Sequence, residues 1–218
     1  MQQVPLYKKI LSMVYPVLVK TAEESDRVPL PQLYLYRGQY QVATHDALYS
    51  DGTRYRPLKI AYAKIEQKLP GVKNVLVLGT GLGSAVQILY NKGYQPEYTL
   101  VDYDKTTLKW AMELLPAVVA PKTTPVLNDA ESFMQTHDKQ YDLVVVDIFK
   151  GRRVPAFVMT TAFLQNCRRC MKPAATLVLN YMINNEAEWQ GSLVAFKQAF
   201  PNHEVITTGI NRLIIATV

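Results

Sequence analysis

The chain has 218 residues, 49% of them hydrophobic, which is enough for one large domain with its own apolar core. A charged fraction of 19% and 14 tyrosines exclude an intrinsically disordered chain. The apolar stretch at residues 10–19 is interrupted by Pro16 and falls short of the roughly 20 residues that a bilayer span needs. No small-residue cleavage site of a signal peptide follows it, so we expect a cytoplasmic protein with no contact to a membrane.

Residues 1–56 predict a small β-rich N-terminal region. Apolar or alternating runs predict strands at residues 12–19, 33–36 and 40–44. Turn signals follow at Arg37-Gly38 and at Asp51-Gly52. Pro57 then suits the first turn of a helix, with helical spacing over residues 58–69. We therefore expect a second domain over residues 57–218.

From residue 73 onward, predicted strands and helices alternate. Strands are predicted at residues 74–78, 98–101, 125–127, 141–146 and 176–179, and helices at residues 84–92, 104–114, 130–136, 159–171 and 187–200. Such alternation, with continuous apolar strand runs, is typical of an α/β fold with a parallel sheet covered on both faces. Strands at residues 204–208 and 212–217 are joined by a connection too short for a helical crossover, so they should pair antiparallel.

Charge is unevenly distributed along the chain. Residues 1–73 hold 11 basic and 6 acidic side chains, residues 74–151 hold 6 and 9, and residues 152–218 hold 7 and 3. The net charge of +6 therefore comes from two basic end segments on either side of an acidic middle segment. No continuous basic stripe appears, so a nucleic-acid partner is disfavoured.

Three glycines follow the first strand of the alternating part at every second position. Gly79, Gly81 and Gly83 stand between a buried strand and a helix, where glycine allows a tight turn and close approach of a ligand. The dinucleotide fingerprint would have its third glycine at the position of Ser84. The spacing therefore favours an adenosyl-sulfonium ligand over a dinucleotide, and a tight turn without a ligand is the alternative.

Acidic residues follow the next three strands. Because ligands of parallel α/β sheets bind beyond the carboxyl ends of the strands, Asp102, Asp129 and Asp147 should face one crevice. Asp102 can accept hydrogen bonds from both ribose hydroxyls, whereas helix capping suits Asp104 better. Asp129 can accept from an adenine amino group, cap the helix that starts at Ala130, or do both.

Taken together, these motifs resemble a known family. Gly-x-Gly-x-Gly, Val-Asp-Tyr-Asp, Asn-Asp-Ala and Tyr-Asp-x-x-x-x-Asp are similar to the motifs of class I S-adenosylmethionine-dependent methyltransferases, and more narrowly to those of spermidine synthases. The run Asp-x-Phe-x-Gly-x-x-Val-Pro that begins at Asp147 also resembles this branch. The resemblance implies a Rossmann-like, mostly parallel seven-stranded sheet with an antiparallel last strand, preceded by a small β-rich region. It also implies a homodimer formed through the β-rich end.

The resemblance further implies a set of functional residues and no metal. The donor would be S-adenosylmethionine or its decarboxylated form, held by Gly79, Thr80, Gly81, Gly83, Asp102, Tyr103, Asp129 and Ala130. Asp147 would receive the amine proton as nitrogen attacks the carbon next to the sulfonium. Apart from the resemblance, Tyr49, Ser50 and Tyr55 are candidates to cover the ligand, with ordinary core or surface positions as the alternative. Lys150 would lie near the acceptor.

Two departures from the spermidine synthase pattern bear on the acceptor. The second aspartate of the family, three residues after the first, is Lys150 here, and its Tyr-His-Glu run is Tyr55-Arg56-Pro57. A diammonium substrate needs several carboxylates as partners for its charges. Lys150, Arg152 and Arg153 would instead repel it and favour an acidic substrate. A solvated loop is the alternative interpretation of these three cations. We therefore expect transfer of a methyl or aminopropyl group to a small molecule other than a standard polyamine.

Other functions compete with this interpretation. A nucleic-acid or protein methyltransferase is compatible with the charge, but amino-methylating DNA enzymes usually carry Asp/Asn-Pro-Pro-aromatic where this chain has Asp-Ile-Phe-Lys. A non-catalytic adenosyl-binding module is another possibility. A dehydrogenase is disfavoured by the early third glycine. Cys167 and Cys170 form a single Cys-x-x-Cys at the end of a helical pattern, which favours core packing over a metal or redox site.

Overall fold

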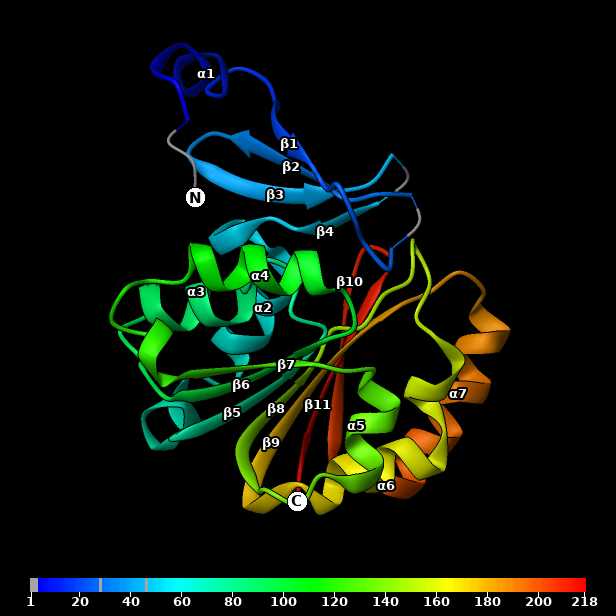
Figure 1. Ribbon diagram of the computed structural model, residues 1–218. Helices are drawn as coiled ribbons and strands as arrows, with labels where there is room; N and C mark the ends of the chain where they lie inside the picture. Colours follow the sequence, from blue (N-terminus) through cyan, green and yellow to red (C-terminus); the bar gives the residue numbers. More distant parts are fainter. Residues whose placement is uncertain (1–3, 28, 46) are drawn as a thin grey trace.

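The computed structural model describes residues 4–27, 29–45 and 47–218 and contains two β-sheets (Figure 1). A four-stranded sheet comes from the N-terminal region, and a seven-stranded sheet comes from the rest of the chain. None of the helices in these described ranges is long and apolar enough to cross a membrane.

The seven-stranded sheet has the topology that the sequence predicted. Its strands are β5 (Asn74–Leu78), β6 (Glu97–Asp102), β7 (Thr123–Leu127), β8 (Tyr141–Val146), β9 (Met171–Met182), β10 (His203–Thr208) and β11 (Asn211–Thr217). Their spatial order is β10-β11-β9-β8-β5-β6-β7. The last strand, β11, runs antiparallel to both of its neighbours, while β5 pairs in parallel with β6 and β8. The predicted α/β fold class is confirmed.

Helices cover both faces of this sheet. One face carries α2 (Arg56–Lys64), α3 (Ser84–Asn91) and α4 (Lys105–Leu114), and the other carries α5 (Ala130–Thr136), α6 (Thr161–Arg169) and α7 (Glu186–Ala199) (Figure 1). Strand periodicity explains the two cores, because Val75 and Val77 face the first helix layer while Leu76 and Leu78 face the second. The strands are therefore apolar on both sides, as the continuous apolar runs predicted.

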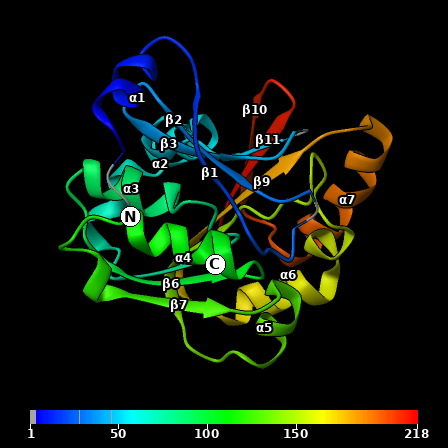
Figure 2. The same ribbon diagram turned by 45° about the horizontal axis from the view of Figure 1, so that its top comes forward.

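The N-terminal region forms an antiparallel meander after a short helix. Helix α1 (Leu6–Leu11) precedes β1 (Val17–Thr21), β2 (Gln32–Tyr36), β3 (Gln39–Ala43) and β4 (Leu48–Ser50). The predicted Arg37-Gly38 turn joins β2 to β3, with positive φ angles of 48° and 74°. Residues Ala22, Leu33 and Val42 pack against Leu82 and Trp110 of the larger domain. Both views place this small sheet over the end of the large sheet where β5 and β8 finish (Figures 1 and 2).

Some predicted boundaries were wrong for local reasons. The strand predicted at residues 12–19 begins only at Val17, because Ser12 still bonds the carbonyl of Lys8 at 2.9 Å and Pro16 has no N–H for a ladder. The helix predicted over 58–69 ends at Lys64 and continues as the 3₁₀ helix Glu66–Gly71.

Further boundary errors lie near α6. The helix predicted over residues 159–171 is shorter, because Thr160 caps it and the chain has already entered β9 at Met171. The 3₁₀ helix Ala156–Met159 precedes that cap.

Candidate functional site

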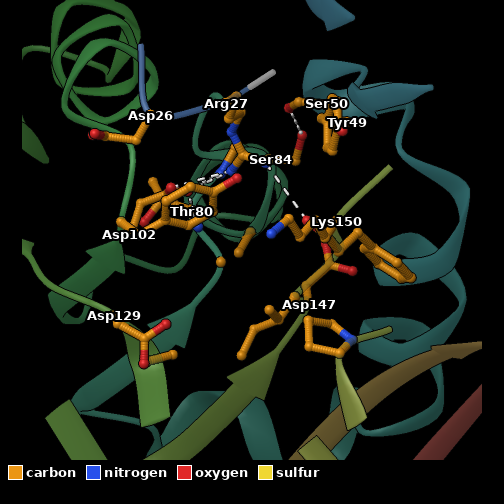
Figure 3. Close-up of a pocket in the computed structure, with 18 of the residues that line it drawn as sticks. Asp26, Arg27, Tyr49, Ser50, Thr80, Ser84, Asp102, Asp129, Asp147 and Lys150 are labelled. Carbon is orange, nitrogen blue, oxygen red and sulfur yellow. Dashed lines mark hydrogen bonds and ion pairs between the residues drawn. The ribbon is translucent and has the colours of Figure 1, made fainter. Parts of the chain in front are cut away.

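A cavity of about 290 Å³ lies at the carboxyl ends of β5, β6, β7 and β8 (Figure 3). Eleven of the thirteen predicted site residues line it: Tyr49, Ser50, Gly79, Thr80, Gly81, Asp102, Tyr103, Asp129, Ala130, Asp147 and Lys150. Gly83 and Tyr55 do not line it. The N-terminal region supplies part of the wall, because Asp26, Arg27, Tyr49 and Ser50 belong to it. The fold therefore brings together nearly all residues that the sequence singled out.

The three glycines of the loop after β5 differ in what an added side chain would meet. Gly79 has a φ of 86°, and a Cβ there would lie 2.3 Å from the carbonyl oxygen of Asp147. Gly81 packs directly against Ser50, whose Cβ would be 3.2 Å from an added Cβ. Gly83 lies outside the cavity lining, where it precedes α3 and packs on Leu115. A φ of 76° favours glycine at this position, and an added Cβ would lie 3.0 Å from the end of the Leu115 side chain. Contact of Gly83 with a ligand stays a prediction.

Asp102 organises the cavity floor. Its buried carboxylate accepts hydrogen bonds from the backbone N–H groups of Thr80 at 3.1 Å, Gly81 at 3.4 Å and Asp104 at 3.0 Å. Burial raises the pKa of Asp102, and the neighbouring Arg27 cation opposes that rise. Asp104, in turn, caps α4 by accepting from the N–H of Thr107 at 2.6 Å, as the sequence favoured.

Arg27 is a site residue that the sequence did not predict. Its guanidinium is 7% exposed and pairs with Asp102 at 3.1 Å. It lies between the rings of Tyr49 and Tyr103, each 4.7 Å away. Burial favours loss of the proton, but Asp102 outweighs it together with the other neighbouring acids, so the pKa of Arg27 is raised. In the sequence, Arg27 lies in an ordinary charged loop, 75 residues before its partner Asp102.

The segment around Arg27 is fastened to the same strand end. The hydroxyl of Ser25 donates to the Asp104 carboxylate, and the N–H of Asp26 donates to it at 3.0 Å. The hydroxyl of Thr106 donates to the carbonyl of Glu24 at 2.6 Å. Residues 24–27 therefore form a strap across the end of β6, which closes one side of the cavity.

Asp129 and Asp147 occupy the lower part of the cavity in Figure 3. Asp129 caps α5 through one oxygen, which accepts from the N–H of Glu131 at 2.9 Å and of Ser132 at 3.1 Å. Its second oxygen is left for a ligand, so capping and ligand contact are compatible. The capping role is confirmed, and the adenine contact stays a prediction.

Asp147 is held by a polar network at the ends of β8 and β9. Its Oδ1 accepts from the hydroxyl of Tyr55 at 3.0 Å and from the Nδ2 of Asn180 at 2.8 Å. The Oδ1 of Asn180 accepts from Asn211 at 2.9 Å, which fixes the amide orientation. Burial raises the pKa of Asp147 to about 6, although both hydrogen bonds favour the ionised form. Asn180 and Asn211 were not predicted, although Asn180 directly follows the predicted strand at 176–179.

Tyr49 and Ser50 of β4 contact the start of α3 and the loop after β8. The Ser50 hydroxyl lies 2.7 Å from that of Ser84, and the Tyr49 hydroxyl accepts from the N–H of Gly151 at 2.9 Å. Lys150 lies on the Asp147 side of the cavity, opposite Asp102 and Asp129 (Figure 3). Of the three predicted cations, Lys150 therefore faces this cavity, whereas Arg152 and Arg153 do not line it.

The two cysteines lie in the core. Cys167 and Cys170 are fully buried, and burial raises the pKa of both thiols. The Cys170 thiol donates to the carbonyl of His137 at 3.1 Å. The predicted packing role of this pair is confirmed.

The sheet order and the loop-built cavity define the class I methyltransferase architecture. Within it, residues 63–214 match the family model of the spermine/spermidine synthase domain, so the chain belongs to that family.

Two curated relatives share 29% identity with this chain over 113 residues, which is 50% of it. They are an N-terminal histidine N-methyltransferase of Emericella nidulans, with 20% of its length matched, and a polyamine aminopropyltransferase of Alkaliphilus oremlandii, with 40% matched. The chain therefore spans less than half the length of these relatives.

Solved structures support the fold. The spermidine synthase of Thermotoga maritima superposes with a TM-score of 0.71 at 13% identity, covering 92% of this chain and 72% of that one. Human methyltransferase-like protein 13 superposes with a TM-score of 0.62 at 16% identity, covering 74% of this chain and 79% of that one.

The glycine loop gives a test of the cavity geometry by substitution. Gly79→Ala should lower the free energy of unfolding by about 3 kcal/mol, because it combines a positive φ with a clash against the Asp147 backbone. Gly93→Ala is the matched control, since Gly93 has a φ of 89° but nothing within 4 Å of an added Cβ. It should cost about 1 kcal/mol. Urea unfolding measures both, and equal costs would contradict the close approach of the two loops.

Proposed function

We propose that the protein transfers a methyl or aminopropyl group from S-adenosylmethionine or its decarboxylated form to an amine nitrogen of a small molecule. The main observation behind this proposal is the position of Asp147. It lies beside the glycine loop and accepts hydrogen bonds from Tyr55 and Asn180. The N-methyltransferase and the aminopropyltransferase among the relatives support a transferase that acts on nitrogen.

The charges of the cavity fit a cationic sulfonium donor. Among the described residues, its lining holds four carboxylates and two cations: Asp26, Asp102, Asp129, Asp147, Arg27 and Lys150. The donor's adenosine would lie between Asp102 and Asp129, with Tyr103 and Ala130 beside it and Gly79, Thr80 and Gly81 next to the methionine-derived part. The ribose would share the Asp102 carboxylate with Arg27 and the loop amides.

Asp147 would serve as the proton acceptor. With a pKa of about 6, its carboxylate is largely ionised at neutral pH and still basic enough to take a proton from an amine. Tyr55 and Asn180 fix the carboxylate so that it can align the nitrogen for attack. The nitrogen lone pair forms the new N–C bond while the C–S bond breaks, and its electron pair leaves a neutral thioether. The proton on the product nitrogen then passes to Asp147.

Lys150 is the reason to propose an acceptor other than a standard polyamine. On its side of the cavity the described lining offers one carboxylate, Asp147, and one cation, Lys150 (Figure 3). A diamine would therefore place its second ammonium without a carboxylate partner and near a like charge.

Asp102 provides a binding test of the donor site. Asp102→Ala should weaken S-adenosylmethionine by more than about tenfold, because it removes acceptors for the ribose and releases the glycine loop. Isothermal titration calorimetry measures the affinity. Asp138→Ala is a control, because Asp138 is 84% exposed and pairs with Arg169 away from the cavity. Unchanged affinity in Asp102→Ala would mean that the donor binds elsewhere.

Asp147→Asn should separate binding from chemistry. Turnover should fall by about 100-fold or more because the variant cannot accept the proton, while donor affinity changes by less than about threefold. The raised pKa of Asp147 means that its ionised form destabilises the fold at neutral pH, so the variant should not unfold more easily. Equal turnover in variant and parent would remove Asp147 from the reaction.

The pH dependence of kcat supplies an independent signature. Activity of the parent should fall as the pH drops through about 6, since Asp147 becomes protonated there. The same step should be missing from the residual activity of Asp147→Asn. A step near pH 6 in both proteins would assign this ionisation to another group.

A further inference from the structure

A second cavity of about 450 Å³ adjoins the first one. The two cavities share Tyr49 and Phe149 in their walls. The second cavity lies among the start of α2, the loop after β8 and the turn between β10 and β11. The two spaces therefore meet at this shared wall.

The second cavity is rich in arginine. Arg54, Arg56 and Arg152 line it, and Asp51 is the acid among its described lining residues. Asp51 is already occupied, because it pairs with Arg54 at 2.9 Å. No ion pair of the described residues involves Arg56 or Arg152, and both residues are exposed. Two free guanidinium groups beside a cavity suit an oxyanion, which they can bind through paired N–H groups.

The second cavity also reaches the catalytic network. Tyr55 lines it, and the hydroxyl of Tyr55 lies 3.0 Å from the Asp147 carboxylate. Asn211 lines it as well and holds Asn180, the other partner of Asp147. A molecule in this cavity could therefore present one end to Asp147 and the other to the arginines.

We infer that the second cavity is the acceptor site and that the acceptor is a small amine carrying a carboxylate. The inference rests on the proposed function, because Asp147 is taken to receive the proton of the attacking nitrogen. The amine would lie at Asp147 and Tyr55, and the carboxylate at Arg56 and Arg152. Because Asp147 lines the first cavity and the arginines line the second, a methylene chain should separate the two groups, and Pro57 and Met182 offer apolar wall for it.

Matched pairs of amines test this inference. 4-Aminobutanoate and 1,4-diaminobutane have the same number of carbons, but the first ends in a carboxylate where the second has another ammonium. 5-Aminopentanoate and 1,5-diaminopentane form a second pair of the same kind. Each is incubated with S-adenosylmethionine or decarboxylated S-adenosylmethionine, and the thioether nucleoside released is measured. The carboxylated member should have a kcat/KM at least about tenfold higher in both pairs.

Arginine variants assign the preference to this cavity. Arg56→Met and Arg152→Met should each raise the KM of the preferred amino acid by about fivefold or more, with little change in kcat or in donor affinity. Arg153→Met is the matched control, because Arg153 is an exposed cation of the same loop that lines neither cavity. It should behave like the parent.

Three outcomes would overturn the inference. The first is a diamine used as well as its carboxylated partner, and the second is a preference that survives both Arg56→Met and Arg152→Met. The third is donor binding without turnover of any of the four amines. All three leave the donor site intact, whereas failure of both donors to bind would contradict the proposed function itself.

Discussion

The carboxylate of Asp102 joins three segments that are far apart in the sequence. It accepts from the glycine loop after β5, from the backbone at the start of α4 and from Arg27 of the N-terminal strap. Removing one partner of such a buried pair typically costs about 3–5 kcal/mol, because the other charge is left unpaired. The shape of the first cavity therefore depends on this side chain, which holds both the glycine loop and the N-terminal strap in place.

Opposite charges divide the two cavities. Acids at successive strand ends make the first cavity suited to a sulfonium cation, whereas unpaired arginines make the second suited to an anion. Asp147 lies at the junction, where Tyr55 reaches it from the second cavity. The uneven charge of the sequence, with an acidic middle and basic flanks, thus has a spatial counterpart in the folded protein.

Sequence reasoning succeeded where a residue's role follows from its place on a strand end. Asp102, Asp129 and Asp147 could be placed in one crevice because parallel strands all finish at the same edge. Arg27 could not be found this way, since it lies in a loop whose position depends on packing of the small sheet against Leu82 and Trp110. Gly83 does not line this cavity and has a φ of 76°, which favours glycine with or without a ligand, so its assignment to the ligand stays a prediction. The helix α1 was missed because no element was predicted over residues 6–11, ahead of the strand expected at 12–19.

The most direct measurement is a crystal structure of the protein with methylthioadenosine, the nucleoside product of aminopropyl transfer. The adenosine should lie between Asp102 and Asp129, and its sulfur should face Asp147 beside Gly79. A nucleoside bound at another place, or one whose sulfur points away from Asp147, would contradict the assignment of this cavity as the donor site.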